Sequence, residues 1–366
     1  MADAAPLKQT PLNSLHRRLG ARMVDFGGWD MPVQYSGILD EHHSVRKAVG
    51  LFDVSHMGEI VIRGAQAFDL VNYAATSAVS KLAIGQAQYA GLLYAHGGFV
   101  DDILVYKVAE DHYFLCVNAS NQEKDYEHIC SINRFEAAVD FASDRYAQLA
   151  VQGPKAAATV QKLASLDLST IRYYRFADGQ VSGIPARIAR TGYTGEDCFE
   201  LFIEPQHAER LWDLVTQAGQ EFGIRPCGLG ARNTLRLEAG MALYGHEISA
   251  SITPIEAGLA RNCDMTKDFH GRATCLKQLE EGVSRKLIGF EMRGRGIARD
   301  GYEVHVDGVA AGWVTTGSPS PTLNKNIGLC YLPASQAVIG RTIHVIVRGQ
   351  PVEAVTVATP FYKRAK

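Results

Sequence analysis

The chain has 366 residues, of which 46% are hydrophobic and 21% are charged, and its formal net charge at pH 7 is -2. This length predicts two or three domains with a sizeable core, and the composition is typical of globular proteins. A charge this close to zero argues against nucleic acid as the main ligand. No apolar run approaches the roughly 18 residues of a membrane span, and no basic segment precedes an apolar one at the start, so we expect neither a membrane span nor a signal peptide.

Seven cysteines are scattered along the chain, and none forms a Cys-x-x-Cys pair. This spacing predicts neither a zinc site nor a disulfide framework, and it favours a reducing compartment. With no targeting segment visible, we expect a cytoplasmic protein. The run Glu41-His42-His43 invites a metal interpretation. Neighbouring side chains on a helix diverge by about 100°, so we expect a solvated helix face there and no metal site.

In chain order, the spacing of apolar residues first predicts a helix over 37–52, with Leu39, Val45 and Phe52 on one face. The clearest amphipathic helix is predicted over 206–220. Strands and helices follow one another without a regular βαβ rhythm and without a recognisable internal repeat, which predicts an α+β fold. The other elements of this part are strands at 59–63, 102–107, 113–118, 146–152 and 186–191, and helices at 120–135, 154–165 and 228–240.

The C-terminal part of the chain differs in character, because short apolar runs alternate with turn residues after about residue 284. Asp307-Gly308, between two such runs, is a strong signal for a hairpin turn. The pattern predicts a small all-β unit, either a sandwich or a barrel. Its strands are expected at 286–292, 302–306, 309–316, 327–332, 343–348 and 352–358.

Two adjacent carboxylates, Asp101 and Asp102, stand where a glycine turn leads into an apolar strand. Successive side chains of a strand point to opposite faces, so only one of the two acids can face a given cavity. The other must face solvent, a helix N-terminus or a hydrogen-bond partner. Because an apolar pocket shifts the pKa of a carboxyl group, the pair is a candidate general base or charge stabiliser. The alternative is a turn that ends in two exposed acids.

Further charged side chains could contact a ligand. Glu200 resumes a strand after a glycine-rich turn, and this position suits a fixed ligand contact better than that of Glu196 in the turn itself. Arg232 and Arg236 are four residues apart and therefore share a helix face. Such a pair can hold a carboxylate or form surface ion pairs.

Aromatic and thioether side chains could form the walls of such a site. Met57, a flexible thioether next to a glycine, suits a ligand-contacting wall, whereas His56 beside it is interpreted as a loop histidine. Tyr89, Tyr193 and Tyr244 are either aromatic walls for a planar ligand or core residues. The chain has no phosphate-binding Gly-x-x-x-x-Gly-Lys-Ser/Thr, no Gly-x-Gly-x-x-Gly, no His-Glu-x-x-His and no Gly-x-Ser-x-Gly.

Taken together, seven segments resemble the T-protein family of the glycine cleavage system, whose members are aminomethyltransferases. The two most characteristic are Phe52-Asp53-Val54-Ser55-His56-Met57 and Gly97-Gly98-Phe99-Val100-Asp101-Asp102. All seven occur in family order, and the resemblance extends from about residue 10 to 362. The others are 23–29, 192–196, 230–240, 252–259 and 316–323.

The resemblance implies an α+β, three-domain cloverleaf around a central channel that holds tetrahydrofolate, with a small β-barrel at the C-terminus. We expect a discontinuous first α+β domain at 1–56 plus 144–250, a second α+β domain at 57–143, a connecting segment at 251–283 and the barrel domain at 284–366.

The resemblance also implies the reaction. A lipoylated H-protein would carry an aminomethyl group, and the T-protein would transfer its one-carbon unit to tetrahydrofolate. Ammonia, 5,10-methylenetetrahydrofolate and the dihydrolipoyl H-protein would be released. The P- and L-proteins of the same system would be functional partners. The basic residues Arg17, Arg18, Arg22 and Lys286 are candidates for guiding an acidic lipoyl carrier.

Family positions then map onto single residues of this chain. The key aspartate matches Asp102, whose implied role is to orient the folate and to accept or relay a proton. Asn233 and Cys198 depart from the family, which commonly has Asp and Gly at these positions, and we expect tuning rather than loss of activity. No metal is implied. The folate-contacting positions fall on Met57, Tyr89, Asn118, Tyr193, Glu200, Arg232 and Tyr362.

Two alternatives stay open at this point. A related folate-dependent demethylase would act on another small donor with the same fold. A non-enzymatic folate-binding protein of the iron–sulfur assembly type would carry a Lys-Gly-Cys-based segment where this chain has Arg190-Thr191-Gly192-Tyr193. The Asp101-Asp102 pair and the segment 52–57 favour the aminomethyltransferase.

Overall fold

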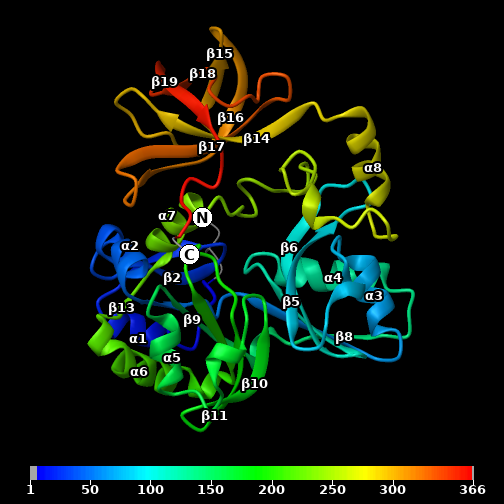
Figure 1. Cartoon of the computed structure of the whole chain (residues 1–366), viewed down its shortest axis with the longest axis vertical. Helices are drawn as coiled ribbons and strands as arrows, with labels where there is room; N and C mark the ends of the chain where they lie inside the picture. The colour runs from blue at the N-terminus through cyan, green and yellow to red at the C-terminus, as the bar shows by residue number, and fades with distance from the viewer. Residues whose placement is uncertain (1–5, 365–366) are drawn as a thin grey trace.

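The chain folds into three lobes, each built on its own β-structure, as the computed structural model in Figure 1 shows. The structure describes residues 6–364. A six-stranded sheet, a five-stranded sheet and a closed six-stranded barrel make up the lobes. A small hairpin of β1 (Arg22–Phe26) and β2 (Trp29–Gln34) lies beside the first of them.

The six-stranded sheet has helices on both faces. Its core packs against α1 (Asn13–Arg18), α5 (Ala156–Gln161) and α6 (Ala208–Gly219) on one side. The other side packs against α2 (Ile38–Lys47) and α7 (Leu229–Glu238). The strands, in sheet order, are β10 (Phe176–Val181), β11 (Ile184–Ala189), β12 (Cys198–Ile203), β9 (Ala147–Gln152), β3 (Gly50–Asp53) and β13 (Arg225–Pro226), and only β13 pairs in parallel.

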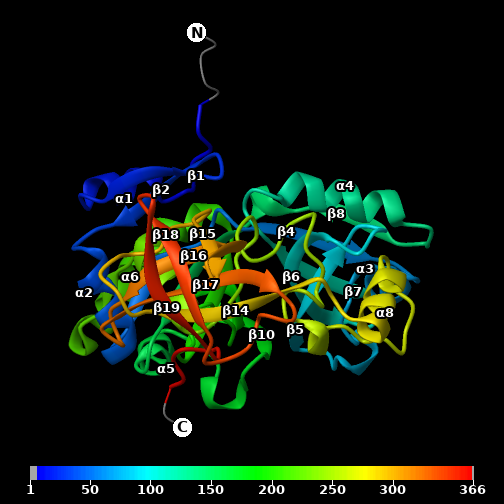
Figure 2. The same ribbon diagram turned by 90° about the horizontal axis from the view of Figure 1, so that it is seen from above.

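The five-stranded sheet is antiparallel throughout and packs one face against α3 (Ala67–Ala74) and α4 (Gln122–Ile132). Its other face packs against the six-stranded sheet through edge-to-face aromatic contacts among Tyr106, Phe114 and Phe202. Figure 2 shows the two sheet lobes side by side from above. The strands, in sheet order, are β5 (Gln86–Leu93), β6 (Phe99–Ala109), β7 (His112–Val117), β4 (Gly58–Arg63) and β8 (Ala138–Phe141).

The two sheets also meet edge to edge. The outer strands β5 and β10 are joined by the hydrogen bonds from Ala87 N to Tyr174 O and from Phe176 N to Gly85 O, both 2.9 Å long. This seam lies beside the central cavity described below, since Tyr174 lines that cavity.

The two sheet lobes repeat one order of elements. The order β4-α3-η1-β5-β6-β7-α4-β8 recurs as β9-α5-η3-β10-β11-β12-α6-β13, apart from short 3-10 turns that flank α6. The short 3-10 helices that correspond are η1 (Val79–Lys81) and η3 (Leu168–Thr170). The expectation of no internal repeat is therefore wrong for the fold. The repeat is hidden in the sequence because different apolar side chains can fill equivalent core positions.

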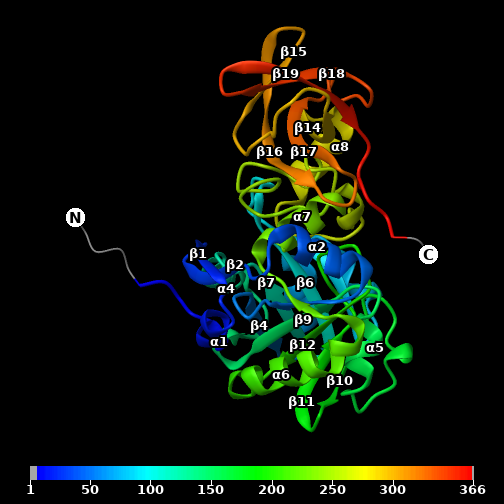
Figure 3. The same cartoon turned by 90° about the vertical axis from the view of Figure 1, so that its left-hand side faces the viewer.

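The C-terminal strands close into a barrel, one of the two forms that the turn spacing allowed, which confirms the expectation of a small all-β unit. Asp307 and Gly308 both have positive φ, of 53° and 81°, as the tight turn between β15 and β16 requires. In Figure 3 the barrel stands at one end of the molecule, above α7. Its strands, in order, are β14 (Arg285–Met292), β17 (Lys325–Pro333), β16 (Val309–Ser320), β15 (Glu303–Val306), β18 (Thr342–Val347) and β19 (Gln350–Val357).

The segment between the lobes runs from α7 past η6 (Ala260–Asn262) to α8 (Arg272–Glu281), which lies between the second lobe and the barrel in Figure 1. Phe99, Phe269 and Tyr331 belong to one buried cluster there, so this segment packs against both neighbours. The strands of each lobe fall inside the domain limits expected above, and those limits stay a prediction.

Most predicted elements exist, with two notable differences. The helix expected over 37–52 ends at Lys47, and β3 begins at Gly50, where a Cβ would meet Val45 at 2.5 Å and Cys227 at 2.8 Å. Several strands were not predicted, namely β1, β2, β3, β5, β8, β10 and β13. Among the described residues, no helix is both long and apolar enough to cross a bilayer.

Candidate functional site

A cavity of about 610 Å³ lies where the two sheet lobes meet the segment after α7. Its walls come from β5, β6, β12 and α7, and from the turn between β1 and β2. The structure brings seven of the expected site residues together around this space: Met57, Tyr89, Asp102, Asn118, Tyr193, Glu200 and Arg232.

The two adjacent acids divide as strand alternation requires. Asp102 lines the cavity, whereas Asp101 is fully buried on the opposite face of β6. Asp101 accepts hydrogen bonds from Asn118 N and Asn118 Nδ2, both at 2.9 Å, and from Asn121 Nδ2 at 2.6 Å. Of the possibilities given for the second acid, solvent, a helix N-terminus or a hydrogen-bond partner, the structure shows hydrogen-bond partners. The alternative of two exposed acids is wrong.

Asn118 connects the two carboxylates. Its Nδ2 donates to Asp102 Oδ1 at 2.8 Å and to the Asp102 carbonyl at 3.1 Å, as well as to Asp101. Burial, followed by the charge of Asp101, raises the pKa of Asp102 to about 7, and hydrogen bonds from Tyr89 and Asn118 oppose that rise. A carboxyl group with this pKa can accept or release a proton near neutral pH.

Glu200 forms a second acidic point of the cavity. It lies buried on β12 and accepts a hydrogen bond from Thr191 Oγ1 at 2.5 Å. Burial raises the pKa of Glu200, while Thr191 and the charge of Arg232 act in the opposite direction. The remaining acceptor positions of this carboxylate can receive N–H donors from a ligand.

Arg232 is a cation without an acidic partner. Its guanidinium stacks on the Tyr193 ring with 4.6 Å to the ring centroid, and Nη1 is buried with no hydrogen-bond partner among residues 6–364. No acid among residues 6–364 lies within ion-pair distance of Arg232, whereas Arg236 has such a partner. Burial lowers the pKa of the Arg232 guanidinium. A buried, unpaired donor facing a cavity is costly unless a ligand supplies the acceptor.

Arg236 behaves differently from Arg232, although both lie on α7. Arg236 is fully buried, pairs with Glu247 at 2.6 Å, and donates through Nε to Asn233 Oδ1 at 2.9 Å. Of the two alternatives, a held carboxylate or surface ion pairs, the second is therefore wrong for Arg236. Asn233, the departure from the family, supports Arg236 and not Arg232.

The aromatic side chains form two walls. The Tyr193 hydroxyl donates a hydrogen bond to the Ala242 carbonyl. Tyr89 lies on β5, where it is paired with Leu104 of the neighbouring strand β6. Tyr244 also lines the cavity, and Lys124 lies 4.1 Å from its ring centroid and donates to its hydroxyl at 3.0 Å.

Sequence reasoning missed several lining residues. His56 is buried beside Met57, and burial and the charge of Arg232 lower its pKa to about 4, so the imidazole is neutral at pH 7. Its Nδ1 has no partner among the described residues. The sequence already placed Met57 at a ligand-contacting wall, and this was a signal that the adjacent His56 could also line the site. Others that were not singled out are Phe26, Gln148, Tyr174 and Met241.

Tyr362 is not among the lining residues. Its backbone N–H donates to the Glu238 carbonyl at 2.8 Å, and its ring lies on the guanidinium of Arg46, 4.0 Å from the ring centroid. The C-terminal segment runs along the end of α7 and keeps this ring away from the cavity. A folate contact of Tyr362 stays a prediction to which this geometry gives no support.

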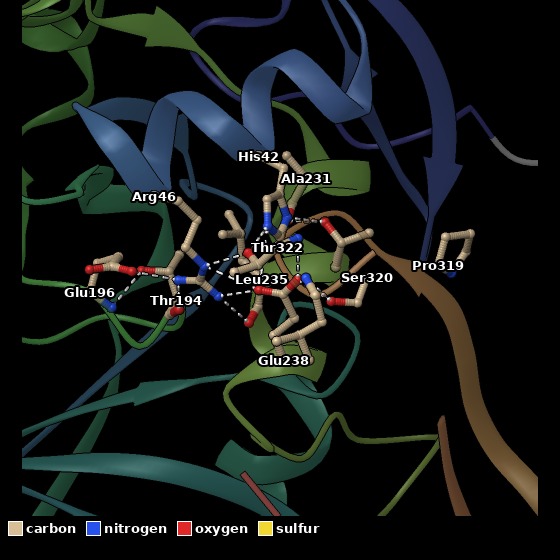
Figure 4. A network of polar contacts seen from close by, with 12 residues as sticks. His42, Arg46, Thr194, Glu196, Ala231, Leu235, Glu238, Pro319, Ser320 and Thr322 are labelled. Carbon is tan, nitrogen blue, oxygen red and sulfur yellow. Dashed lines mark hydrogen bonds and ion pairs between the residues drawn. The ribbon is translucent and has the colours of Figure 1, made fainter. Parts of the chain in front are cut away.

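Arg46 is the centre of a buried polar network that joins the first lobe to the barrel (Figure 4). It donates to Glu196 at 2.9 Å, to Glu238 at 2.8 Å and to the Thr194 carbonyl at 2.7 Å. Glu238 in turn accepts from Ser320 Oγ at 2.5 Å on the barrel. Glu196 therefore has a structural role.

The expected solvated face of Glu41 and His42 is also wrong, because both side chains are fully buried. His42 is within hydrogen-bond distance of Thr234 and Thr322, 2.8 Å from each, and Glu41 accepts the Gly228 N–H at 2.8 Å. Apolar spacing could not reveal this, since the neighbours come from α7 and the barrel. Within residues 6–364 no cluster of three or more His, Cys, Asp or Glu side chains is placed to hold a metal ion.

Comparison with known proteins agrees with this architecture. Residues 12–267 match the GCVT N-terminal domain, and residues 285–363 match the glycine cleavage T-protein C-terminal barrel domain. The aminomethyltransferase of Acidobacterium capsulatum is 54% identical over 375 residues, covering 100% of this chain and 99% of the relative. That of Desulfitobacterium hafniense strain DCB-2 is 48% identical over 360 residues, covering 98% and 99%.

A solved structure gives the same result. The crystal structure of glycine cleavage system aminomethyltransferase T from Bartonella henselae matches with a TM-score of 0.92 at 32% identity, covering 98% of both chains. Fold and cavity thus define a transferase with a GCVT fold and a C-terminal barrel. The chain belongs to the glycine cleavage T-protein family, and it functions as an aminomethyltransferase. The expected α+β architecture is confirmed, and a demethylase acting on another donor is not favoured.

Proposed function

We propose that the chain transfers the one-carbon unit of an aminomethyl group, carried on the lipoyl arm of an H-protein, to tetrahydrofolate. Ammonia, 5,10-methylenetetrahydrofolate and the dihydrolipoyl H-protein are the products. The single observation that carries the proposal is Asp102, a carboxyl group with a pKa of about 7 that faces a central cavity.

The residues around the cavity fit a folate. The volume of about 610 Å³ is in the range of small-molecule sites. A pterin has an edge of N–H donors, and Glu200 offers carboxylate oxygens to such an edge. Tyr89, Tyr193 and Met57 offer apolar and aromatic surface to a planar ring. Arg232, whose charge acts on Glu200, offers an unpaired N–H donor to an acceptor atom of the ligand.

Asp102 has the chemical role in this proposal. The folate supplies the amine nitrogens that accept the one-carbon unit. Asp102 orients that part of the ligand and holds the proton released when a nitrogen forms its new bond. Asn118 fixes the Asp102 carboxylate through its 2.8 Å hydrogen bond, so the acid is aimed before the ligand arrives.

The lipoylated H-protein is the proposed partner, and the P- and L-proteins are its functional neighbours. All four basic residues suggested for docking are exposed, and two of them, Arg17 and Arg18, also pair with Asp30 and Glu209. A cytoplasmic location stays a prediction.

The test is the formation of ammonia and methylenetetrahydrofolate from aminomethyl-loaded H-protein, with and without tetrahydrofolate. Folate-dependent release supports the proposal, and wild-type protein with unloaded H-protein is the control. Tetrahydrofolate binding without turnover would overturn the proposed donor and leave a demethylase with another donor to be assayed.

A further inference from the structure

A third carboxyl group lies behind the two that the sequence indicated. Asp125, in the first turn of α4, is fully buried. Neither of its carboxylate oxygens has a donor among residues 6–364. Asp101, by contrast, has three N–H donors, two of them from Asn118. No sequence pattern pointed to Asp125, which lies in a charged helical run.

The surroundings decide which of these acids holds a proton. Burying an ionised carboxylate without hydrogen-bond donors raises the free energy of the folded protein strongly. A protonated carboxyl group needs only an acceptor for its O–H. Burial raises the pKa of Asp125 well above its ordinary value, and the charge of Asp101 and a hydrogen bond between the two carboxyl groups add to that rise. Asp101 is thus the acceptor within reach.

We propose that Asp125 is a positioning residue that keeps its proton at neutral pH, donates it in a hydrogen bond to Asp101, and thereby holds Asp101 ionised beside Asp102. This inference rests on the proposed role of Asp102. A chain of contacts then runs from α4 to the cavity: Asp125 donates to Asp101, and Asn118 donates to both Asp101 and Asp102.

Other titratable groups lie near Asp101, Asp102 and Asp125, among them Tyr174, Tyr193 and Cys116. Asp101 and Asp102 come from β6, and Tyr89 comes from β5. Lys124 lies on α4 itself, where its charge lowers the pKa of Asp125, and it is bound to Tyr244 from the segment after α7. Tyr244 stays protonated near neutrality, because burial, followed by the charge of Asp101, raises its pKa to about 12.

The proton on Asp125 has a consequence for Asp102. Asp102 loses its proton near pH 7 and then places its negative charge beside Asp101. A hydrogen bond donated by Asp125 stabilises the doubly charged state of Asp101 and Asp102 at least as strongly as the singly charged state. In the singly charged state the remaining proton can move to Asp101. Removing that donor must therefore raise the pKa of the pair, whichever carboxyl group holds the proton.

The experiment compares Asp125→Leu with Asp125→Asn, since leucine removes the donor at similar size and asparagine keeps an N–H donor. Folding of each variant is checked by circular dichroism and thermal unfolding. The pH profile of aminomethyl transfer is then recorded. We expect the apparent pKa to rise by about one unit in Asp125→Leu and by much less in Asp125→Asn. Glu127→Gln, an exposed acid on the same helix, is the matched control.

A second measurement needs no substrate. The infrared difference spectrum of ligand-free wild type minus Asp125→Asn at pH 8 should contain the C=O band of a protonated carboxyl group, whereas wild type minus Glu127→Gln should lack it. The subtraction removes bands of other buried acids such as Glu59, whose pKa burial also raises. Absence of the band from the first difference spectrum, or an unchanged pH profile in a folded Asp125→Leu, overturns the inference. Failure of the proposed function is distinguishable, because the wild type would then show no folate-dependent turnover while the infrared band would still be present.

Discussion

Glu238 Oε2 accepts hydrogen bonds from both Nε and Nη2 of Arg46, at 3.1 and 2.8 Å, although the two residues are 192 positions apart. The Arg46 side chain is 5% exposed and that of Glu238 is not exposed at all. Because the second oxygen of Glu238 accepts from Ser320 on the barrel, this ion pair ties the barrel to the helices α2 and α7. The attachment of the third lobe thus depends on a few buried charges.

Arg46→Met should destabilise the protein strongly. The change leaves Glu196 and Glu238 buried without their cation, and breaking a buried ion pair in this way costs about 3–5 kcal/mol. Chemical unfolding gives the free energy, and hydrogen exchange should show the barrel strands losing protection first. Arg18→Met is the control, because its pair with Glu209 is half exposed and contributes at most about 1 kcal/mol. Equal effects of the two variants would contradict the role of the network.

Asp102→Asn should abolish turnover and leave folate binding largely intact, because the amide keeps the size of the acid but cannot take the proton. Calorimetric titration with tetrahydrofolate and the transfer assay separate the two effects. Substantial turnover in this variant would contradict the role given to Asp102. Wild-type activity should rise as pH increases through about 7, where the carboxyl group loses its proton.

The same variant should also be more stable than the wild type at high pH. The pKa of Asp102 is raised from 3.8 to about 7 on folding, so ionisation favours the unfolded chain. The gain of Asp102→Asn should be absent below pH 3.8, grow as pH rises, and level off above about 7. Its limit is on the order of 4 kcal/mol. Urea unfolding at pH 5 and pH 8 measures it, and an equal difference at both pH values would count against the buried carboxyl group.

Arg232→Met and Arg236→Met should act in opposite directions on stability. Arg232 is an unpaired cation, so its removal should raise the melting temperature while raising KM for tetrahydrofolate by roughly 10- to 100-fold. Arg236→Met leaves Glu247 buried without its partner and should lower the melting temperature. Differential scanning calorimetry and steady-state kinetics test both. A lower melting temperature for Arg232→Met would show that this arginine supports the fold.

Gly98→Ala should disturb the start of β6 and with it both acids. A Cβ at Gly98 would lie 1.8 Å from the Ala250 carbonyl oxygen, so the chain must shift by more than a side chain can absorb. The expected cost is about 1–3 kcal/mol, with a loss of activity. Gly296→Ala is the control, since its Cβ would meet only ordinary contacts at 3.6 Å. Unfolding and transfer assays compare the two, and a fully active Gly98→Ala would contradict this packing.

The sequence indicated local features better than distant ones. The barrel strands, the buried face of α6 and the division between Asp101 and Asp102 follow from periodicity along one element. The burial of Glu41 and His42 depends on α7 and the barrel, which lie nearly 200 positions or more away in the chain. Asp125 could not be predicted either, because its acceptor lies on another element, β6. Its own segment has the pattern of an ordinary charged helix.

The seam between β5 and β10 has a consequence for solubility. An outer strand exposes unpaired N–H and C=O groups that can recruit another chain and start aggregation. Here each sheet satisfies part of the other's edge. The Ala87 N–H donates to the Tyr174 carbonyl, and the Phe176 N–H donates to the Gly85 carbonyl. Either sheet lobe, expressed separately, would expose this edge strand to solvent. We therefore expect each isolated lobe to aggregate unless the other lobe is supplied.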